Sequence, residues 1–162
     1  MIFPVFLLSS QSMEEQQPKL NFPPVELNER LDSEGRLSIP DIIRGGYIVL
    51  TPEERVRRHL IGWLMSECGA ELRSIITEHP VSLNGTAQRA DVVVSDRNGK
   101  PLLLAECKAP DIQIDRSVLA QAVRYNSVLG ARYIVLTNGI RHYCYEHTDD
   151  GGYLPLREFP KL

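Results

Sequence analysis

Residues 90–108 read ADVVVSDRNGKPLLLAECK and predict a β-hairpin that carries charged side chains within two apolar strands. The runs VVV and LLLA flank Asn98-Gly99, a pair that favours a two-residue type I′ turn because both positions need a positive φ. With that turn, Asp91 is expected to face Glu106, and directly opposite side chains have Cβ atoms about 4.5–5.5 Å apart. The stretch therefore predicts two carboxylates side by side on one sheet.

Lys108 is expected to join this pair, because alternation along a strand places it on the same face as Glu106. The same register places Arg89 opposite Lys108. It also places Pro101 opposite Asp96, at a pair where a proline costs no hydrogen bond to the partner strand. Two carboxylates and an ammonium group should thus converge on one small patch.

Facing acids repel each other unless a positive charge lies between them. Lys108 can supply that charge, and a divalent cation supplies more of it. Mg²⁺ binds oxygen ligands, typically one or two carboxylates with waters and phosphate oxygens, and Mn²⁺ is expected to substitute for it. The alternative is an exposed hairpin with solvated charges, but the almost wholly apolar neighbours argue against it. Cys107 points to the opposite face and is expected to belong to the core.

Two helices and further strands complete the expected fold. A helix should run from Thr51 to about Cys68, with Thr51 as its N-cap, Pro52 in its first turn and Glu54 completing a capping box. A second helix is expected over 116–129 and ends at Gly130. Strands are expected at 72–83, 133–137 and 140–146, after a short lead-in at 39–50 and before a tail of little regular pattern from 148. This order predicts an α/β fold with a mixed sheet.

Composition is that of an ordinary soluble protein of one domain, with 43% hydrophobic and 24% charged residues in 162. Residues 1–24 are expected to form a tail and residues 25–162 the domain. The apolar start, MIFPVFLLSS, is too short to span a membrane, so no membrane association is expected. Three cysteines without CxxC spacing favour a reducing compartment, here the cytoplasm, and argue against a zinc ribbon.

The net charge of −3 means that binding to nucleic acid would need a local basic patch rather than a basic total. The candidates for that patch are Arg55, Arg57, Arg58, Arg89, Lys100, Arg116 and Arg124. The alternative is that these charges are scattered over the surface.

The spacing of Asp91 and Glu106-Cys107-Lys108 resembles the signature of the PD-(D/E)XK nucleases, with Ala90 in place of the first proline. Over residues 45–147 the chain also resembles the N-terminal nuclease domain of type I restriction enzyme R subunits. That wider likeness rests on Thr51-Pro52-Glu53-Glu54, Arg89-Ala90-Asp91, Glu106-Cys107-Lys108-Ala109-Pro110, Gln121-Ala122-Val123-Arg124-Tyr125 and Leu136-Thr137-Asn138-Gly139. The spacing of Gln121 and Tyr125 is also seen in RecB-like nucleases.

The resemblance implies a restriction-endonuclease-like core, a mixed central sheet flanked by helices, in an Mg²⁺-dependent endonuclease that hydrolyses DNA. Asp91 and Glu106 would hold one or two Mg²⁺ ions, with the main-chain carbonyl of Cys107 as a further ligand. Lys108 would orient the attacking water or neutralise charge on the phosphate. In the resemblance these three side chains, Asp91, Glu106 and Lys108, are the catalytic residues.

Further residues are expected to support this site. Gln121 and Tyr125 are four apart on one helix face and would contact the nucleic acid or brace the lysine, and Arg89 would contact a phosphate. Glu54 is a candidate extra metal ligand, although it also has the capping role, and Glu78 is similarly placed. The alternative for Gln121 and Tyr125 is helix-surface polarity and a tyrosine that belongs to the core.

Other functions fit the same residues. The first alternative is a catalytically silent DNA-binding or protein-interaction module of the same fold, and the second is a junction-specific enzyme acting as a homodimer. The sequence contains no GxxxxGK[ST] motor motif. We therefore expect a stand-alone copy of the nuclease part in restriction-modification, which acts on DNA with a helicase or specificity subunit as partner.

Overall fold

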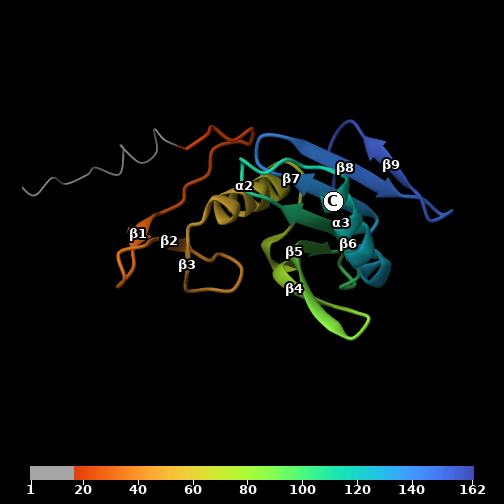
Figure 1. Cartoon of the computed structure of the whole chain (residues 1–162), viewed down its shortest axis with the longest axis horizontal. Coiled ribbons are helices and arrows are strands. Elements are labelled where there is room, and N and C mark those ends of the chain that lie inside the picture. The colour runs from red at the N-terminus through yellow and green to blue at the C-terminus, as the bar shows by residue number, and fades with distance from the viewer. Residues whose placement is uncertain (1–16) are drawn as a thin grey trace, which may run out of the picture.

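The computed structural model describes residues 17–162, which form a large mixed sheet, a small sheet and two helices. The small antiparallel sheet contains β1 (Arg30–Leu31), β2 (Leu37–Pro40) and β3 (Tyr47–Val49). It lies at the N-terminal end of the body, away from the large sheet (Figure 1). Residues 1–16, most of the predicted tail, lie outside the described residues.

The large sheet has the order β4-β5-β6-β7-β8-β9. Only β6 and β7 are parallel, and α3 provides the crossover between them. The predicted α/β fold with a mixed central sheet flanked by helices is confirmed. The elements are α2 (Pro52–Ser66), a 3₁₀ turn (Leu72–Ser74), β4 (Ile75–Leu83), β5 (Thr86–Ser95), β6 (Pro101–Cys107), α3 (Arg116–Leu129), β7 (Tyr133–Thr137), β8 (His142–His147) and β9 (Tyr153–Leu156).

Both helices begin at an N-cap residue whose side chain accepts backbone hydrogen bonds. The Thr51 hydroxyl accepts a hydrogen bond from the Glu54 N–H at 3.1 Å, so Thr51 is the N-cap as predicted. The predicted capping box is only half formed, because the Glu54 carboxylate pairs with Arg57 instead. Helix α3 has the predicted bounds: Asp115 caps its start, and Gly130 ends it at φ 68°.

The helices cover opposite faces of the sheet, and each face has its own core. Helix α2 packs on one face through Val56, Leu60 and Leu64, together with Val92, Ala105 and Cys107 of the sheet. Helix α3 packs on the other face through Val118, Ala122 and Tyr125, together with Val93, Leu104, Ile134 and Leu136. Cys107 is fully buried in the first core, as predicted. Glu106 therefore points to the α3 side.

The β5–β6 pairing confirms the predicted register but corrects the turn. Val92 pairs with Ala105, and Val93 with Leu104, as the predicted alignment requires. The turn, however, has a positive φ only at Gly99, and Asp96 accepts hydrogen bonds from the N–H groups of Asn98 and Lys100. This adds one residue to the loop, so Pro101 pairs with Ser95 rather than Asp96. The shift in register after Val94 restores the predicted alignment further along.

Several short elements were not predicted. The lead-in forms β2 and β3, the expected strand at 72–83 begins with a 3₁₀ turn, and the expected irregular tail contains β9, which pairs with β8. Leu20 is buried and Phe22 lies 5.7 Å from Trp63 between ring centroids, so part of the predicted tail packs on the body. The boundary at residue 24 stays a prediction. In the part of the chain that the structure describes, neither helix has the length and apolar character that crossing a membrane requires.

Candidate functional site

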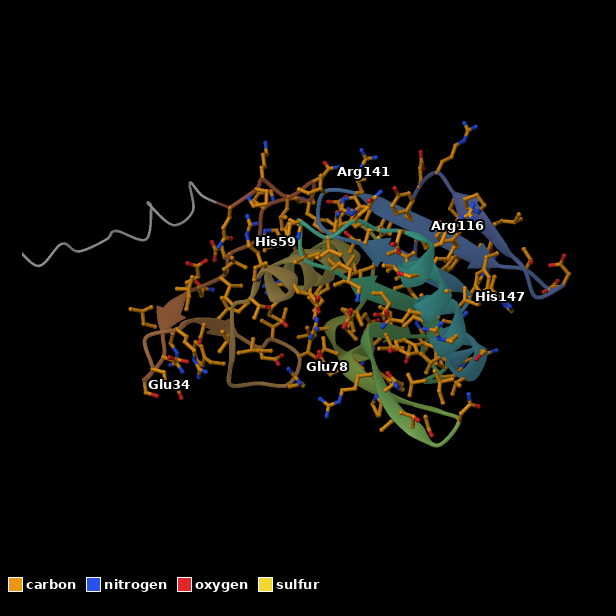
Figure 2. The ribbon with its side chains drawn as sticks, in the orientation of Figure 1. Glu34, His59, Glu78, Arg116, Arg141 and His147 are labelled. Atoms are coloured by element: carbon orange, nitrogen blue, oxygen red, sulfur yellow. The ribbon has the colours of Figure 1, made fainter. Side chains whose placement is uncertain are left out.

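The acids converge at an irregularity in the β4–β5 hairpin. On one side of it the inward-pointing residues pack into the α2 core, and on the other side they pack into the α3 core. Ile75 and Val92 belong to the α2 core, whereas Val81 and Ala90 belong to the α3 core, although even spacing in a regular strand keeps one face. Glu78 lies between these positions with a φ of 54°, a conformation rare in a strand. Figure 2 labels Glu78, which lies on β4 of this hairpin. The irregularity therefore falls at the site itself.

Asp91 is held by contacts from two elements. Its Oδ2 accepts a hydrogen bond from the Cys107 N–H at 2.7 Å, and its Oδ1 lies 3.4 Å from Arg57 Nη2. Burial raises the pKa of Asp91, whereas the Cys107 N–H and the Arg57 charge act to lower it. The carboxylate is thus fixed in orientation next to the end of β6.

Glu106 is only partly satisfied by hydrogen bonds. It is 1% exposed, its Oε2 accepts a hydrogen bond from Gln121 Nε2 at 3.4 Å, and its Oε1 is buried without a hydrogen-bond partner. Burial, followed by the charge of Asp91, raises its pKa to about 9. The prediction that Asp91 and Glu106 come together holds in the structure, because each carboxyl affects the pKa of the other.

Arg57 is a central residue of this cluster. The sequence had suggested it only as a member of a basic patch. Its side chain is 6% exposed, with Nη1 at 2.6 Å from Glu78 Oε1 and at 3.2 Å from Glu54 Oε2. Burial acts to lower the pKa of Arg57, but the carboxylates of Glu54 and Asp91 hold it above its ordinary value. Arg57 is therefore a buried counter-ion, and not part of the predicted basic patch.

A chain of polar side chains leads from Glu106 to the sheet edge. Gln121 Nε2 donates to the Tyr125 hydroxyl at 3.1 Å, and this hydroxyl donates to Gln88 Oε1 at 3.3 Å. Tyr125 is buried in the α3 core, as the alternative interpretation predicted, and its hydroxyl bonds to Gln121 and Gln88 rather than to Lys108. Gln88 was not predicted; its place on β5 depends on a pairing that the sequence alone does not show.

The remaining predicted residues differ in how they relate to Asp91 and Glu106. The charge of Lys108 affects the pKa of Asp91 and Glu106, which places its ammonium group near them. Arg89 is 71% exposed and lies 3.9 Å from Glu78, so it faces solvent beside the acids. Glu54 is occupied by Arg57, whereas burial and then the charge of Asp91 raise the pKa of its neighbour Glu53. Glu53 is thus the α2 acid on which the charge of Asp91 acts.

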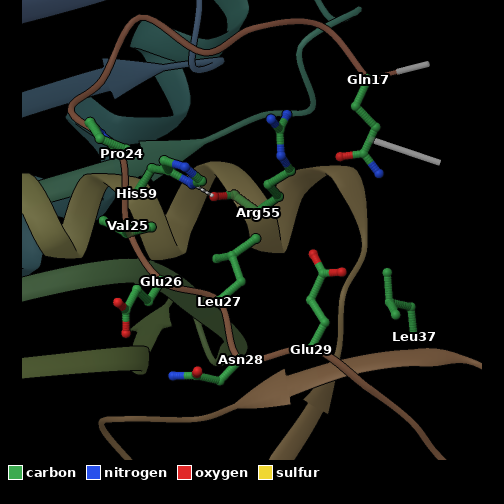
Figure 3. Close-up of a pocket in the computed structure, with 10 residues that line it drawn as sticks. All are labelled: Gln17, Pro24, Val25, Glu26, Leu27, Asn28, Glu29, Leu37, Arg55 and His59. Carbon is green, nitrogen blue, oxygen red and sulfur yellow. Dashed lines mark hydrogen bonds between the residues drawn. The ribbon is translucent and has the colours of Figure 1, made fainter. Parts of the chain in front are cut away.

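Several hollows of the described surface lie away from the acids. One of about 590 Å³ separates α2 from residues 24–29, and Figure 3 shows its lining, where His59 Nδ1 lies 2.8 Å from the Arg55 carbonyl oxygen. It contains none of the acids at the sheet. Within residues 17–162, no group of three or more His, Cys, Asp or Glu side chains is arranged to hold a metal ion by itself.

Comparison with known families now decides what the chain is related to. The family described as type I restriction enzyme R protein N terminus matches residues 52–160, which include every acid of the site. The chain belongs to this family. Among curated proteins, none matches the chain.

A solved structure supports the fold of this R protein N-terminal domain. It is a fragment assigned to the HsdR subunit of a type I restriction enzyme from Vibrio vulnificus YJ016, with a TM-score of 0.54 and 22% identity. The match covers 69% of this chain and 24% of the other, so the chain spans about a quarter of the length of that relative. At this identity the likeness shows the shared fold.

Proposed function

We propose that the chain is a Mg²⁺-dependent nuclease that hydrolyses phosphodiester bonds of DNA in the cytoplasm. The observation that carries this proposal is Glu106 Oε1, a buried oxygen without a partner that lies beside the half-buried carboxylate of Asp91. A buried acceptor without a partner costs about 1–3 kcal/mol. A bound cation would remove that cost, and this would explain why the fold buries an acid without a partner.

The donor set suits a hard divalent cation. Asp91 and Glu106 would hold it, with the main-chain carbonyl of Cys107 as a further ligand, and Mg²⁺ commonly completes such a set with waters and phosphate oxygens. When bound, Mg²⁺ supplies Lewis-acid chemistry and lowers the pKa of a coordinated water. Mn²⁺ prefers the same oxygen ligands and would substitute.

The chain's own residues would orient the reactants. The Cys107 N–H fixes the Asp91 carboxylate, and Gln121, itself bonded to Tyr125, fixes Glu106. Lys108 would neutralise charge that develops on the phosphate or orient the attacking water, because its ammonium group lies near both acids. Arg89 is exposed beside the site and would contact the phosphate backbone.

Family membership supports this proposal and suggests partners. A domain of the R protein N-terminal family is expected to work on DNA together with a helicase and a specificity subunit of a type I restriction enzyme. The PD-(D/E)XK assignment of Asp91, Glu106 and Lys108 belongs to the same proposal. Its support is their convergence in the structure.

A catalytically silent module is the second candidate, and Arg57 favours it. The guanidinium group already pairs with Glu54, Glu78 and Asp91, so much of the acidic charge is neutralised within the chain itself. In that case the fold would bind DNA or a protein, and the acids would serve stability only.

Plasmid nicking separates the two functions. Supercoiled DNA is incubated with the full chain and Mg²⁺ or Mn²⁺, and with the variants Asp91→Asn and Asp96→Asn. The second variant is the matched control, because Asp96 lies in the same hairpin but bonds only to turn N–H groups. Nicking that Asp91→Asn abolishes and Asp96→Asn retains supports the nuclease. Nicking that is equal in all three proteins, or absent from all three, would reject it.

A further inference from the structure

The acidic cluster has more carboxylates than one metal ion needs. Glu54 and Glu78 share Arg57 with Asp91, and the charge of Asp91 acts on the pKa of Glu53, so acids of α2 and β4 lie beside Asp91. Nucleases and phosphatases with two metals use such sets to hold ions about 3.5–4 Å apart. The number of cations that this site takes therefore depends on which carboxylate oxygens are free.

Arg57 occupies the oxygens that a second ion would need. Its Nη1 contacts Glu78 Oε1 at 2.6 Å and Glu54 Oε2 at 3.2 Å, and its Nη2 lies 3.4 Å from Asp91 Oδ1. One guanidinium group thus joins three acids from three elements of the chain. Because the side chain is 6% exposed, solvent competes little for these contacts.

The backbone at Glu78 indicates that this arrangement is built into the fold. A non-glycine residue with a φ of 54° in the middle of a strand is strained, typically by about 1–3 kcal/mol. Its carboxylate makes the shortest contact to Arg57. The opposite side of the cluster differs, because Glu106 Oε1 has no partner and no cation of the chain pairs with it among the described residues.

We infer that Arg57 stands in the place of a second cation, so that the site takes one divalent ion, between Asp91 and Glu106. This inference rests on the proposed function, since it concerns the metal of that site. Arg57 is a positioning residue in this arrangement: it contacts Asp91 Oδ1 and keeps Glu54 and Glu78 from binding metal. Removing its charge frees carboxylate oxygens of three residues at once.

The stoichiometry of Mn²⁺ binding tests the inference without any measurement of activity. Free Mn²⁺ is followed by electron paramagnetic resonance as it is titrated into the full chain, into Arg57→Met and into Arg58→Met. Arg58 is the matched control, the next residue of α2, for which burial alone lowers the pKa. We expect one ion per chain for the wild type and the control, and a second ion for Arg57→Met.

Each outcome decides between the possibilities. Two ions per wild-type chain would overturn the inference and leave the nuclease proposal standing. No ion in the wild type would remove the proposed function and the inference with it. One ion in both the wild type and a folded Arg57→Met would show that Arg57 does not exclude a second ion. If Arg57→Met does not fold, the neutral Arg57→Gln replaces it, and the wild-type stoichiometry alone still separates one ion from two.

Discussion

The β5–β6 hairpin has an aspartate at each end, and the two ends satisfy it in different ways. At the turn, Asp96 Oδ1 accepts hydrogen bonds from the N–H groups of Asn98 and Lys100 at 2.8 and 2.9 Å. At the open end, Asp91 depends on Arg57 of α2 and on the Cys107 N–H, and its neighbour Glu106 has an oxygen without a partner.

This difference suggests that the turn end of the hairpin serves folding and the open end serves function. The turn end is satisfied by residues within five positions of each other, so it helps the hairpin to form by itself. At the open end burial raises the pKa of both acids, and the charge of Asp91 raises that of Glu106 further, a cost that the fold alone does not need. Binding a cation is the explanation that the nuclease proposal gives for that cost.

The largest effect on nicking is expected for Glu106→Gln, which removes a carboxylate from the open end of the hairpin. Nicking should fall by more than about 100-fold, because a proposed metal ligand loses its charge. The metal-free protein should become more stable by about 1–3 kcal/mol, because the buried side chain no longer takes up a proton on folding. Urea unfolding in the presence of a chelator measures the stability. A destabilised variant that keeps its nicking activity would contradict both expectations.

The pH dependence of stability should reflect the raised pKa of the same acid, Glu106. Burial and Asp91 raise the pKa of Glu106 from 4.5 to about 9, so between these values the folded state binds a proton that the unfolded state has lost. Stability of the metal-free protein should therefore fall as the pH rises through this window, by up to about 1.4 kcal/mol per unit. Unfolding at about pH 6 and about pH 8 measures it. An equal slope in Glu106→Gln would assign the effect to other groups.

A smaller effect is expected for Tyr125→Phe, which breaks the polar chain at its middle. The variant loses the bonds that the hydroxyl makes with Gln121 and Gln88, so stability should fall by about 1 kcal/mol. Nicking should fall by about tenfold, because Gln121 then holds Glu106 less firmly. Tyr47→Phe, in the small sheet, is the control. Unchanged nicking in Tyr125→Phe would show that the chain does not position Glu106.

The smallest effect on activity is expected at the turn. Asp96→Ala removes the acceptor of two backbone N–H groups and should lower the free energy of unfolding by about 1 kcal/mol. Nicking should stay within about twofold of the wild type, because distant sites act independently. If Asp96→Ala lost most of its nicking activity while keeping wild-type stability, the turn would have a role in activity, and the proposed separation of the two ends would be wrong.

Local signals predicted the long elements well. The bounds of α3 follow from its apolar spacing and Gly130, and the N-terminus of α2 follows from Thr51-Pro52. The turn at Asn98-Gly99 was wrong because Asp96 binds the loop N–H groups and favours a longer turn. The alignment beside the acids, with Val92 opposite Ala105, was still correct, since the shift in register after Val94 restores it.

The rest could not be predicted from local patterns. Strands β1 and β9 are short, with two and four residues, and depend on pairing with a neighbour. Arg57 appears in the sequence as one charge among several on a helix. Its burial requires Glu78 and Asp91 from strands that are distant along the chain, and these contacts depend on the fold as a whole.

Calorimetric titration of Mg²⁺ into the full chain tests the central claim most directly. The account predicts binding by the wild type and by Asp96→Ala, and its loss in Asp91→Ala, because only the open end of the hairpin offers carboxylates to a cation. Absence of binding to the folded wild type, or equal binding by Asp91→Ala, would contradict it.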